Sequence, residues 1–254
     1  MTRGEKMGNG ESSHAPDGKG KRAILASGGS FNPIHSSHVE MMQTAKERIE
    51  SEGYVVDSGY LVCAYDLHVQ IKCKKAALPV ETRIQLCEIA AQDAGHESWL
   101  FADGPEASAT RYLRRKKEQK FRDEEVLLVC VIGEDLWRRI GSYNEDGFRT
   151  LIVPRPSVPD VFGRTLDNYP VEPFNLLPPS PHLSHCSSTL LRSYFQEGEE
   201  GGVRKAVKEG LISEGVGEVL IDKKYYKTLA NTGGEYREGE EGEEKEEEEE
   251  EEEE

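Results

Sequence analysis

Short β-rich runs alternate with segments of helical periodicity between Lys21 and Tyr226. The first run, residues 22–27, precedes a helix predicted from about Ser37, whose apolar positions recur every three or four residues. Further apolar runs occupy 59–64, 98–104, 125–133 and 149–156, and helical segments occupy 80–95, 108–120 and 186–195, with closing segments at 203–210 and 215–226. This alternation predicts an α/β fold in which helices cover both faces of a parallel sheet.

Four segments carry more specific expectations. The run 125–133 is the most continuous apolar run, as expected of a central strand buried on both faces. In the helix 80–95, Ile84, Cys87 and Ala91 are predicted to face the core, and Gly95 to end the helix. The basic segment 71–79 is predicted to be a loop, and the charged helix 108–120 to present a solvated face.

The ends of the chain differ in composition from its middle. Residues 1–21 are polar and Gly-rich with no apolar run, which fits neither a signal peptide nor a transmembrane segment. From Glu235 onward the chain holds fifteen Glu, one Arg and one Lys, a net charge of −13 out of the total −16. We therefore expect a disordered leader (1–21), one folded domain (22–230) and a disordered acidic tail (231–254) that is either a solubilising terminus or an interaction tail for a basic partner.

Composition also narrows the compartment and the partners. The five cysteines form no CxxC pair and are odd in number, which argues against a disulfide framework and indicates a reducing, intracellular compartment. Because no targeting signal is legible, the cytoplasm is the default, with a nuclear location left open, and no membrane partner is expected. The "RRKK" run at 114–117 could bind nucleic acid, yet Glu118 and the acidic composition favour a solvated helix face. No nucleic-acid partner is expected, and the sequence leaves a homo-oligomer open.

The stretch "ASGGSFNPIHSSHVEMM", residues 26–42, is the first candidate site. It would lie beyond the carboxyl end of the first strand, where a helix N-terminus offers unpaired N–H groups to an anion. Gly28 and Gly29 would allow unusual φ values or a close backbone approach to phosphate. His35 and His38 are three residues apart, so their rings are predicted to project to the same side of the helix N-terminus. Taken alone, this stretch also fits an ordinary loop.

The stretch "SSTLLR", residues 187–192, is the second candidate site. Its hydroxyls stand at a helix start, where serine and threonine are ordinary N-caps. Ser188 and Arg192 are four residues apart and so share one helix face. Capping explains the serines but not the arginine, whose planar fork suits phosphate oxygens. By contrast, His182 and His185 repeat the HxxH spacing without an acidic or cysteine partner nearby, so we expect a loop there and no metal site.

The two stretches together resemble the HxGH-type nucleotidyltransferase superfamily, and most closely the nicotinamide or nicotinate mononucleotide adenylyltransferases. "GGSFNPIHSSH" is similar to the family's phosphate loop, "CSSTLLR" to its ISSTxxR motif and "IGED" to its GxD. "LIVPRP" and the closing segment that ends at Tyr226 also resemble family motifs in the same order. The resemblance spans residues 22–226 and implies a Rossmann-like fold of the nucleotidyltransferase type.

The resemblance also implies roles for particular residues. His35 and His38 would contact the ATP phosphates, with His38 the more critical, and Gly133 and Asp135 would hold the substrate or the ATP ribose. Lys74 or Lys75 would neutralise the phosphate of the mononucleotide. Gly29, Ser30 and Phe31 would line the nucleotide cleft, and Ser187, Ser188, Thr189 and Arg192 would bind the triphosphate.

The implied reaction is attack by a substrate phosphate on the α-phosphorus of ATP, with Mg²⁺ as cofactor and pyrophosphate as product. Ser37 stands where HxGH enzymes carry glycine, Pro105 stands where an aromatic side chain often stacks on the pyridine, and the segment after Asp135 is short. Trp137 or Tyr143 would have to replace the missing ring contact, although a Trp just after a central strand is more often a core residue. Two alternatives remain: another phosphorylated acceptor such as phosphopantetheine, or an inactive nucleotide-binding scaffold with an acidic interaction tail.

Overall fold

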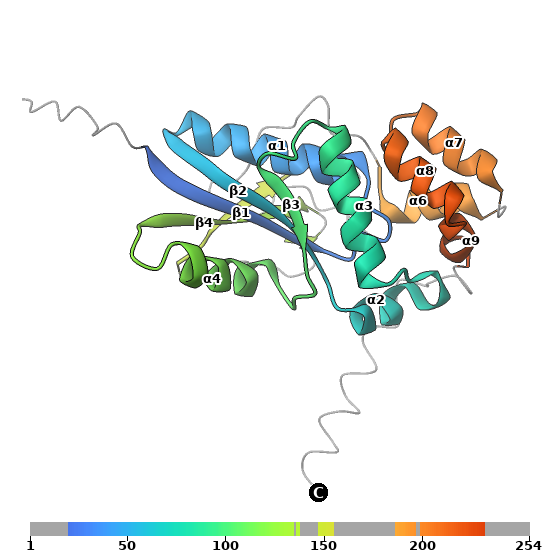
Figure 1. The fold of residues 1–254 in the computed structure, drawn as a ribbon, viewed down its shortest axis with the longest axis horizontal. Helices are drawn as coiled ribbons and strands as arrows, with labels where there is room; N and C mark the ends of the chain where they lie inside the picture. The colour runs from blue at the N-terminus through green and yellow to red at the C-terminus, as the bar shows by residue number, and fades with distance from the viewer. Residues whose placement is uncertain (1–19, 135, 138–146, 155–185, 197–198, 232–254) are drawn as a thin grey trace, which may run out of the picture.

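The computed structural model describes residues 20–134, 136–137, 147–154, 186–196 and 199–231. Within these residues, five strands form one parallel sheet in the order β3-β2-β1-β4-β5 (Figure 1). The strands are β1 (Lys21–Gly29), β2 (Tyr54–Cys63), β3 (Leu100–Asp103), β4 (Val126–Gly133) and β5 (Arg149–Val153). Because every strand is parallel, all their carboxyl ends meet at one edge, where open α/β sheets bind ligands.

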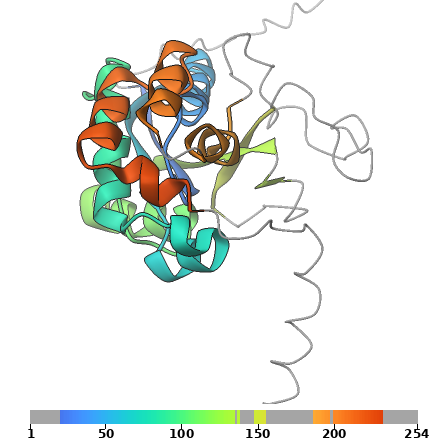
Figure 2. The same cartoon turned by 90° about the vertical axis from the view of Figure 1, so that its right-hand side faces the viewer.

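Helices cover both faces of this sheet, as predicted. They are α1 (Ser36–Ser51), α2 (Asp66–Cys73), the 3-10 turn η1 (Lys74–Ala76), α3 (Val80–Asp93), α4 (Ala109–Lys120), α6 (Ser188–Phe195), α7 (Glu200–Lys208), α8 (Glu214–Asp222) and α9 (Tyr225–Leu229). Figures 1 and 2 show α4 on one side of the sheet, α1 and α3 on the other, and α6 to α9 grouped beside α3. The predicted α/β fold is confirmed.

Alternate residues of each strand enter two separate hydrophobic cores. Leu25 of β1 packs in the core that α1, α3 and the C-terminal helices share, whereas its neighbours Ile24 and Ala26 pack in the core beneath α4. In β4, Val129 enters the first core and Cys130 the second. Side chains on a strand alternate between faces, so burial of successive residues requires cover on both faces. The prediction of a central, doubly buried strand at 125–133 is confirmed.

Helix α3 buries the predicted face and one charged residue beside it. Cys87 and Ala91 are buried as expected and Ile84 packs partly buried against the same core, while the neighbouring Arg83 is fully buried. Arg83 is buried because backbone carbonyl groups at the carboxyl edge of the sheet need hydrogen-bond donors, which an apolar side chain cannot supply. The end of the helix matches its prediction, since Gly95 has φ 72° and the amide of the next residue bonds back to the Ala91 carbonyl at 2.9 Å.

The segment predicted as a loop after β2 is largely helical. It forms the end of α2 and η1, which bury a small cluster of Val69, Cys73 and Ala76. Leu67 and Ile71 are 69% and 68% exposed on the same helix. Apolar residues on both the buried and the exposed side hide the helical period, so the sequence pattern could not reveal α2.

Helix α4 is solvated on one side only. Its basic residues lie mostly at the surface, but Tyr112 and Leu113 are fully buried against the sheet. The prediction of a solvated face therefore holds for the outer side and was wrong for the inner side. Among the described helices, none combines the length and the apolar character needed to cross a membrane.

An ion-pair cluster joins the end of α1 to the start of β5 and gives a pH prediction. The Glu52 carboxylate accepts hydrogen bonds from Arg149 and, at 2.6 Å, from Arg48. The Arg149 hydrogen bond is the main reason that the pKa of Glu52 falls from 4.5 to about 2, with Arg48 adding to it against the opposing effect of burial.

Stabilisation by Glu52 is therefore complete above about pH 4.5 and disappears as the pH falls toward 2. We expect Glu52→Gln to lower the free energy of unfolding by about 1 kcal/mol at pH 7, since the cluster is partly exposed to solvent. Urea unfolding of both proteins between pH 7 and pH 3 checks this. A difference that stays constant over that range would contradict the assignment.

Candidate active site

The turn from β1 into α1 places two histidine rings against each other. His35 is the N-cap residue of α1, and His38 is the third residue of the helix. Their ring centroids lie 3.7 Å apart with 30° between the planes, and His35 is 2% exposed. The prediction that both rings lie on one side of the helix N-terminus is confirmed.

A backbone hydrogen bond fixes the orientation of the His38 ring. Its Nδ1 accepts from the backbone N–H of His35 at 3.4 Å, and the Phe31 ring meets it edge-on at 4.9 Å and 85°. Because Nδ1 accepts, the neutral His38 ring carries its proton on Nε2. His38 Nε2 is therefore a hydrogen-bond donor, the polarity that a phosphate oxygen requires.

The two glycines before this turn belong to β1 and not to the loop in which we expected them. A side chain at Gly28 would meet the backbone nitrogen of Ala109 at 3.3 Å, and one at Gly29 would meet the Phe31 ring at 3.0 Å. Neither glycine has a positive φ, whereas Phe31 does, at 43°. The groups that approach these glycines within the protein are α4 and Phe31, and the expected approach of a phosphate stays a prediction.

Helix α6 rests directly on this loop. Ser188 Oγ donates to the Pro33 carbonyl at 2.9 Å, and Arg192 Nη1 donates to the Asn32 carbonyl at 2.8 Å. Ser188 and Arg192 thus share one helix face, as their spacing predicted. Ser187 is the N-cap of α6 and accepts from the amide of Leu190 at 3.0 Å. The structure therefore brings the two candidate stretches together, although more than 150 residues separate them.

Arg192 places a positive charge beside the phosphate loop. Its Nη2 also donates to Thr189 Oγ1 at 3.1 Å, so the guanidinium is held at both ends. Burial lowers the pKa of Arg192 below its ordinary value. An arginine nevertheless stays protonated at neutral pH, so the cation remains available to an anion at this loop.

Asn32 is a residue of this site that the sequence did not single out. Its fully buried side chain donates to the Ala76 carbonyl at 2.8 Å and accepts from the Leu78 amide at 2.9 Å. These bonds hold η1 against the loop and so fix the position of Lys74 and Lys75, which are both exposed. A buried asparagine needs partners for both ends of its amide, which only the fold can supply.

Arg83 is the second residue that sequence reasoning missed. Its side chain is fully buried and donates to the carbonyl oxygens of Leu78, Ser30 and Ala64 at 3.0, 2.9 and 2.8 Å. It also bonds to the Asp66 carboxylate at 2.8 Å. One guanidinium thereby joins the chain beyond β1 to the chain beyond β2. The sequence did contain a sign of this role: Arg83 is four residues before Cys87, so it lies on the core-facing side of α3.

The remaining candidates, Gly133 and Asp135, lie at and after the end of β4 in the sequence. Gly133 ends β4 at the same edge of the sheet as Gly29, and a side chain on Gly133 would lie 3.9 Å from the Met41 sulfur. Asp135 and Tyr143 lie outside the described residues. Trp137 is 6% exposed and packs in the core beneath α4, so it is a core residue as its position after a central strand predicted.

The last residue of β3 is bound to α4. Asp103 accepts from the Tyr112 hydroxyl at 2.6 Å and lies 3.1 Å from Lys116. Burial acts to raise the pKa of Asp103, but the hydrogen bonds from Tyr112 and from a backbone amide, together with Lys116, lower it overall. Trp99, at the other end of the strand, packs in the α1–α3 core, whereas Pro105 is exposed. The carboxylate is thus engaged within the protein.

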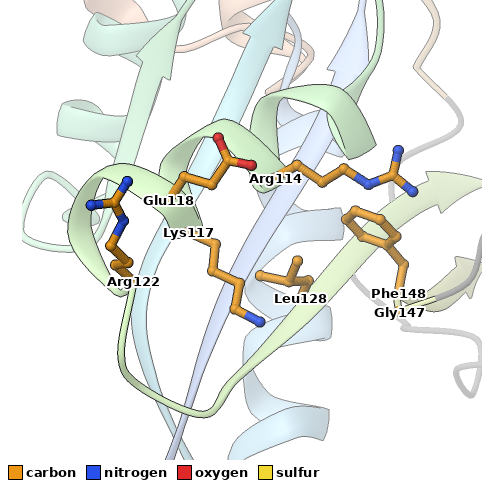
Figure 3. A pocket seen from close by; sticks show the side chains of 7 residues that line it. All are labelled: Arg114, Lys117, Glu118, Arg122, Leu128, Gly147 and Phe148. Atoms are coloured by element: carbon orange, nitrogen blue, oxygen red, sulfur yellow. The ribbon is translucent and has the colours of Figure 1, made fainter.

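The described surface has two hollows. One, of about 320 Å³, is a basic pocket beside the amino end of β5, where the Arg114 guanidinium lies 5.0 Å from the Phe148 ring (Figure 3). The other, of about 360 Å³, lies between α1, α3 and α8, and His35 and Ser36 of the candidate site form part of its lining. The first pocket is lined by Arg114, Lys117, Glu118, Arg122, Leu128, Gly147 and Phe148.

The described residues contain no cluster of three His, Cys, Asp or Glu side chains that could hold a metal ion. His182 and His185 lie outside these residues. The groups that meet at the loop are imidazole rings, a guanidinium and hydroxyls. This set of groups binds an anion better than a cation.

Comparison with known proteins shows the family to which this chain belongs. Residues 26–194 match the family model described as cytidylyltransferase-like, which is more than half of the chain. The chain belongs to the cytidylyltransferase-like family. The matched region begins in β1 and ends in α6, so this cytidylyltransferase-like segment includes both candidate stretches.

Curated relatives agree with the resemblance predicted from the motifs. The chain is 35% identical over 97 residues to the nicotinamide/nicotinic acid mononucleotide adenylyltransferase of Oryza sativa subsp. japonica, covering 37% of this chain and 36% of the relative. It is 31% identical over 91 residues to the protein of the same name from Arabidopsis thaliana, covering 36% and 35%. The matches thus span about a third of these relatives.

Solved structures agree on the fold of this cytidylyltransferase-like chain. A putative nicotinate-nucleotide adenylyltransferase from Vibrio parahaemolyticus is 15% identical with a TM-score of 0.51, covering 82% of this chain and 96% of the other. Nicotinic acid mononucleotide adenylyltransferase from Plasmodium falciparum, complexed with NaAD, is 19% identical with a TM-score of 0.53, covering 81% and 97%. The predicted nucleotidyltransferase type of fold is therefore confirmed.

Proposed function

We propose that this protein is an adenylyltransferase that transfers AMP from ATP to nicotinamide or nicotinate mononucleotide. The products would be the dinucleotide and pyrophosphate. The names of the rice and Arabidopsis relatives support this assignment over the part of the chain that they match. The Plasmodium neighbour, whose structure contains NaAD, supports it through the fold.

The packing of α6 on the histidine loop is the observation that carries the proposal. Ser188 donates to the Pro33 carbonyl and Arg192 to the Asn32 carbonyl, and His35 and His38 follow only a few residues further along the chain. A purely structural contact would not need two histidines and an arginine at the amino end of a helix. A polyphosphate would use all three, together with the backbone N–H groups of α1.

The reaction would proceed by direct displacement. An oxygen of the acceptor phosphate forms a bond to the α-phosphorus of ATP, and the bond from that phosphorus to the bridging oxygen breaks, so pyrophosphate leaves with the electron pair. Both reactants are anions, so the protein must align them and offset the charge that develops on the phosphoryl oxygens. His38 Nε2 and the Arg192 guanidinium would supply that compensation.

Mg²⁺ would enter as part of the ATP substrate. The groups that meet at the loop are donors and cations, with no carboxylate cluster among the described residues to hold the ion directly. Mg²⁺ commonly binds through substrate phosphates and keeps several waters. This chain's own residues would orient the phosphates, while the cation would neutralise part of their charge.

The acceptor phosphate would bind near Lys74 and Lys75. Both lysines are exposed on η1, which Asn32 holds against the loop. The amidated and the acid form of the mononucleotide differ only in the substituent on the pyridine ring. Lysines that bind the phosphate would therefore not distinguish the two forms. Pro105, exposed after β3, supplies no aromatic surface for the ring, so other acceptors belong in the test.

The test is pyrophosphate release by the purified full-length chain with ATP and Mg²⁺. Nicotinamide mononucleotide, nicotinate mononucleotide and phosphopantetheine would be compared as acceptors. We expect release with one or both pyridine nucleotides. Release with phosphopantetheine alone would mean that the reaction is right and the acceptor is wrong. ATP binding without release on any acceptor would favour the scaffold alternative.

A further inference from the structure

Five exposed lysines lie on neighbouring elements that come from two distant parts of the chain. Lys74 and Lys75 lie on η1, Lys223 and Lys224 lie between α8 and α9, and Lys227 lies on α9. η1 and α9 pack against each other, and both views of the fold show α9 next to the α2–η1 segment (Figures 1 and 2). We call these five residues the η1–α9 lysine surface.

The charge of this surface is not neutralised within the described part of the protein. There, no carboxylate lies within ion-pair distance of any of the five lysines. Helix α4, the other basic region, differs, because Lys116 lies 3.1 Å from Asp103, and Arg111 and Arg115 lie 3.4 and 3.5 Å from Glu106. Part of the α4 charge is thus engaged within the protein, whereas the charge of the lysine surface is open to an external anion.

An anionic segment of the same chain begins close to this surface. The tail from Glu235 to Glu254 carries a net charge of −13. Glu235 follows Lys227 by eight residues, which limits their separation to roughly 26 Å even in a fully extended chain. A short tether of this length produces an effective concentration on the order of millimolar. Even a weak electrostatic contact would therefore be substantially populated.

We propose that the acidic tail, residues 235–254, binds in cis to the η1–α9 lysine surface. Lys74 and Lys75 are also where the acceptor phosphate would bind, so the tail competes with that phosphate; this second step rests on the proposed function. Attraction between exposed charges is screened over about 10 Å at 0.1 M salt and about 3 Å at 1 M. Both the contact and the competition are consequently strong at low salt and weak at high salt.

The contact itself can be tested without any activity. A carbodiimide joins a lysine amine to a carboxylate only when the two touch, and mass spectrometry identifies the linked peptides. At low salt, we expect the tail to link to the five lysines of the surface, with at least a fivefold loss at 0.5 M salt. An equal mixture of ¹⁵N-labelled and unlabelled chains would separate links within a chain from links between chains.

Three results would overturn the docking proposal. They are tail links mainly to α4 at Lys116, Lys117 and Lys120, links equally frequent on the exposed Lys208 of α7, and links found only between chains. The first would transfer the contact to the basic region beside the pocket of Figure 3. The second would mean non-specific attraction, and the third a partner of the tail in trans.

The competition is tested by kinetics on the full chain. A variant with all fifteen tail glutamates replaced by glutamine should show a KM for the phosphorylated acceptor about three- to tenfold lower at low salt, with kcat unchanged. The triple variant Lys223→Gln, Lys224→Gln, Lys227→Gln should change KM in the same direction, because it weakens the tail contact without changing Lys74 or Lys75 and places no negative charge beside the acceptor phosphate. The matched control is Lys117→Gln, Lys120→Gln on α4, which should retain the wild-type KM.

The two proposals fail in distinguishable ways. If no acceptor supports pyrophosphate release, the proposed function fails while the cross-link map still decides the docking. If the enzyme is active and the tail links to the lysine surface, but the glutamine variant keeps the wild-type KM at low salt, the competition is wrong.

Discussion

Replacing His38 with alanine is expected to lower turnover with ATP and the pyridine mononucleotide by at least about 100-fold. The substitution removes the Nε2 donor, and the loss of one preorganised donor to a developing oxyanion typically costs about 10² to 10³ in rate. The Nδ1 bond to the His35 amide is lost as well, which should cost about 1 kcal/mol of stability, as for a helix cap. Steady-state pyrophosphate release measures the first effect and thermal unfolding the second.

Two further variants separate chemistry from folding. His38→Gln retains an amide donor near the position of Nε2 and should lose less activity than His38→Ala. His96→Ala changes a histidine just beyond α3, where its ring lies 5.7 Å from Trp99, and should retain near wild-type turnover. Wild-type turnover in a folded His38→Ala protein would refute the role of this residue.

Replacing Arg83 with methionine is expected to lower the free energy of unfolding by about 3 to 5 kcal/mol. Methionine fills much of the volume but leaves the Ser30, Leu78 and Ala64 carbonyls without their donor, and breaking a buried charged network commonly costs this much. At about 2 to 4 °C for each kcal/mol in a chain of this size, the melting temperature should fall by roughly 6 to 20 °C.

Arg22 provides the matched control for this substitution. It forms ion pairs with Asp57 and Glu124, but its side chain is 38% exposed. Arg22→Met should therefore cost less than about 1 kcal/mol. Arg83→Lys keeps the charge with fewer donors and should fall between wild type and Arg83→Met. A melting temperature for Arg83→Met within about 2 °C of wild type would show that the network does not hold the sheet edge.

Predictions from the sequence were best where periodicity decides the structure. The run 125–133 was long and apolar enough to be a doubly buried strand, and Gly95 was a reliable end for α3. The predictions failed where the type of a residue does not match its burial. Leu67 and Ile71 are apolar but exposed on α2, and Arg83 is charged but buried on α3. In both cases the environment, and not the residue type, determines the burial.

The sequence by itself determined the α/β fold and the chemistry of the candidate site. His35, His38, Ser188 and Arg192 could be chosen because their spacing sets which side chains share a helix face, a property of local geometry. Only the tertiary structure decided that α6 contacts the Asn32–Pro33 backbone, that Arg83 joins the ends of two strands, and that η1 meets α9. These contacts connect residues far apart in the chain, and no local pattern encodes which distant carbonyl a buried donor will find.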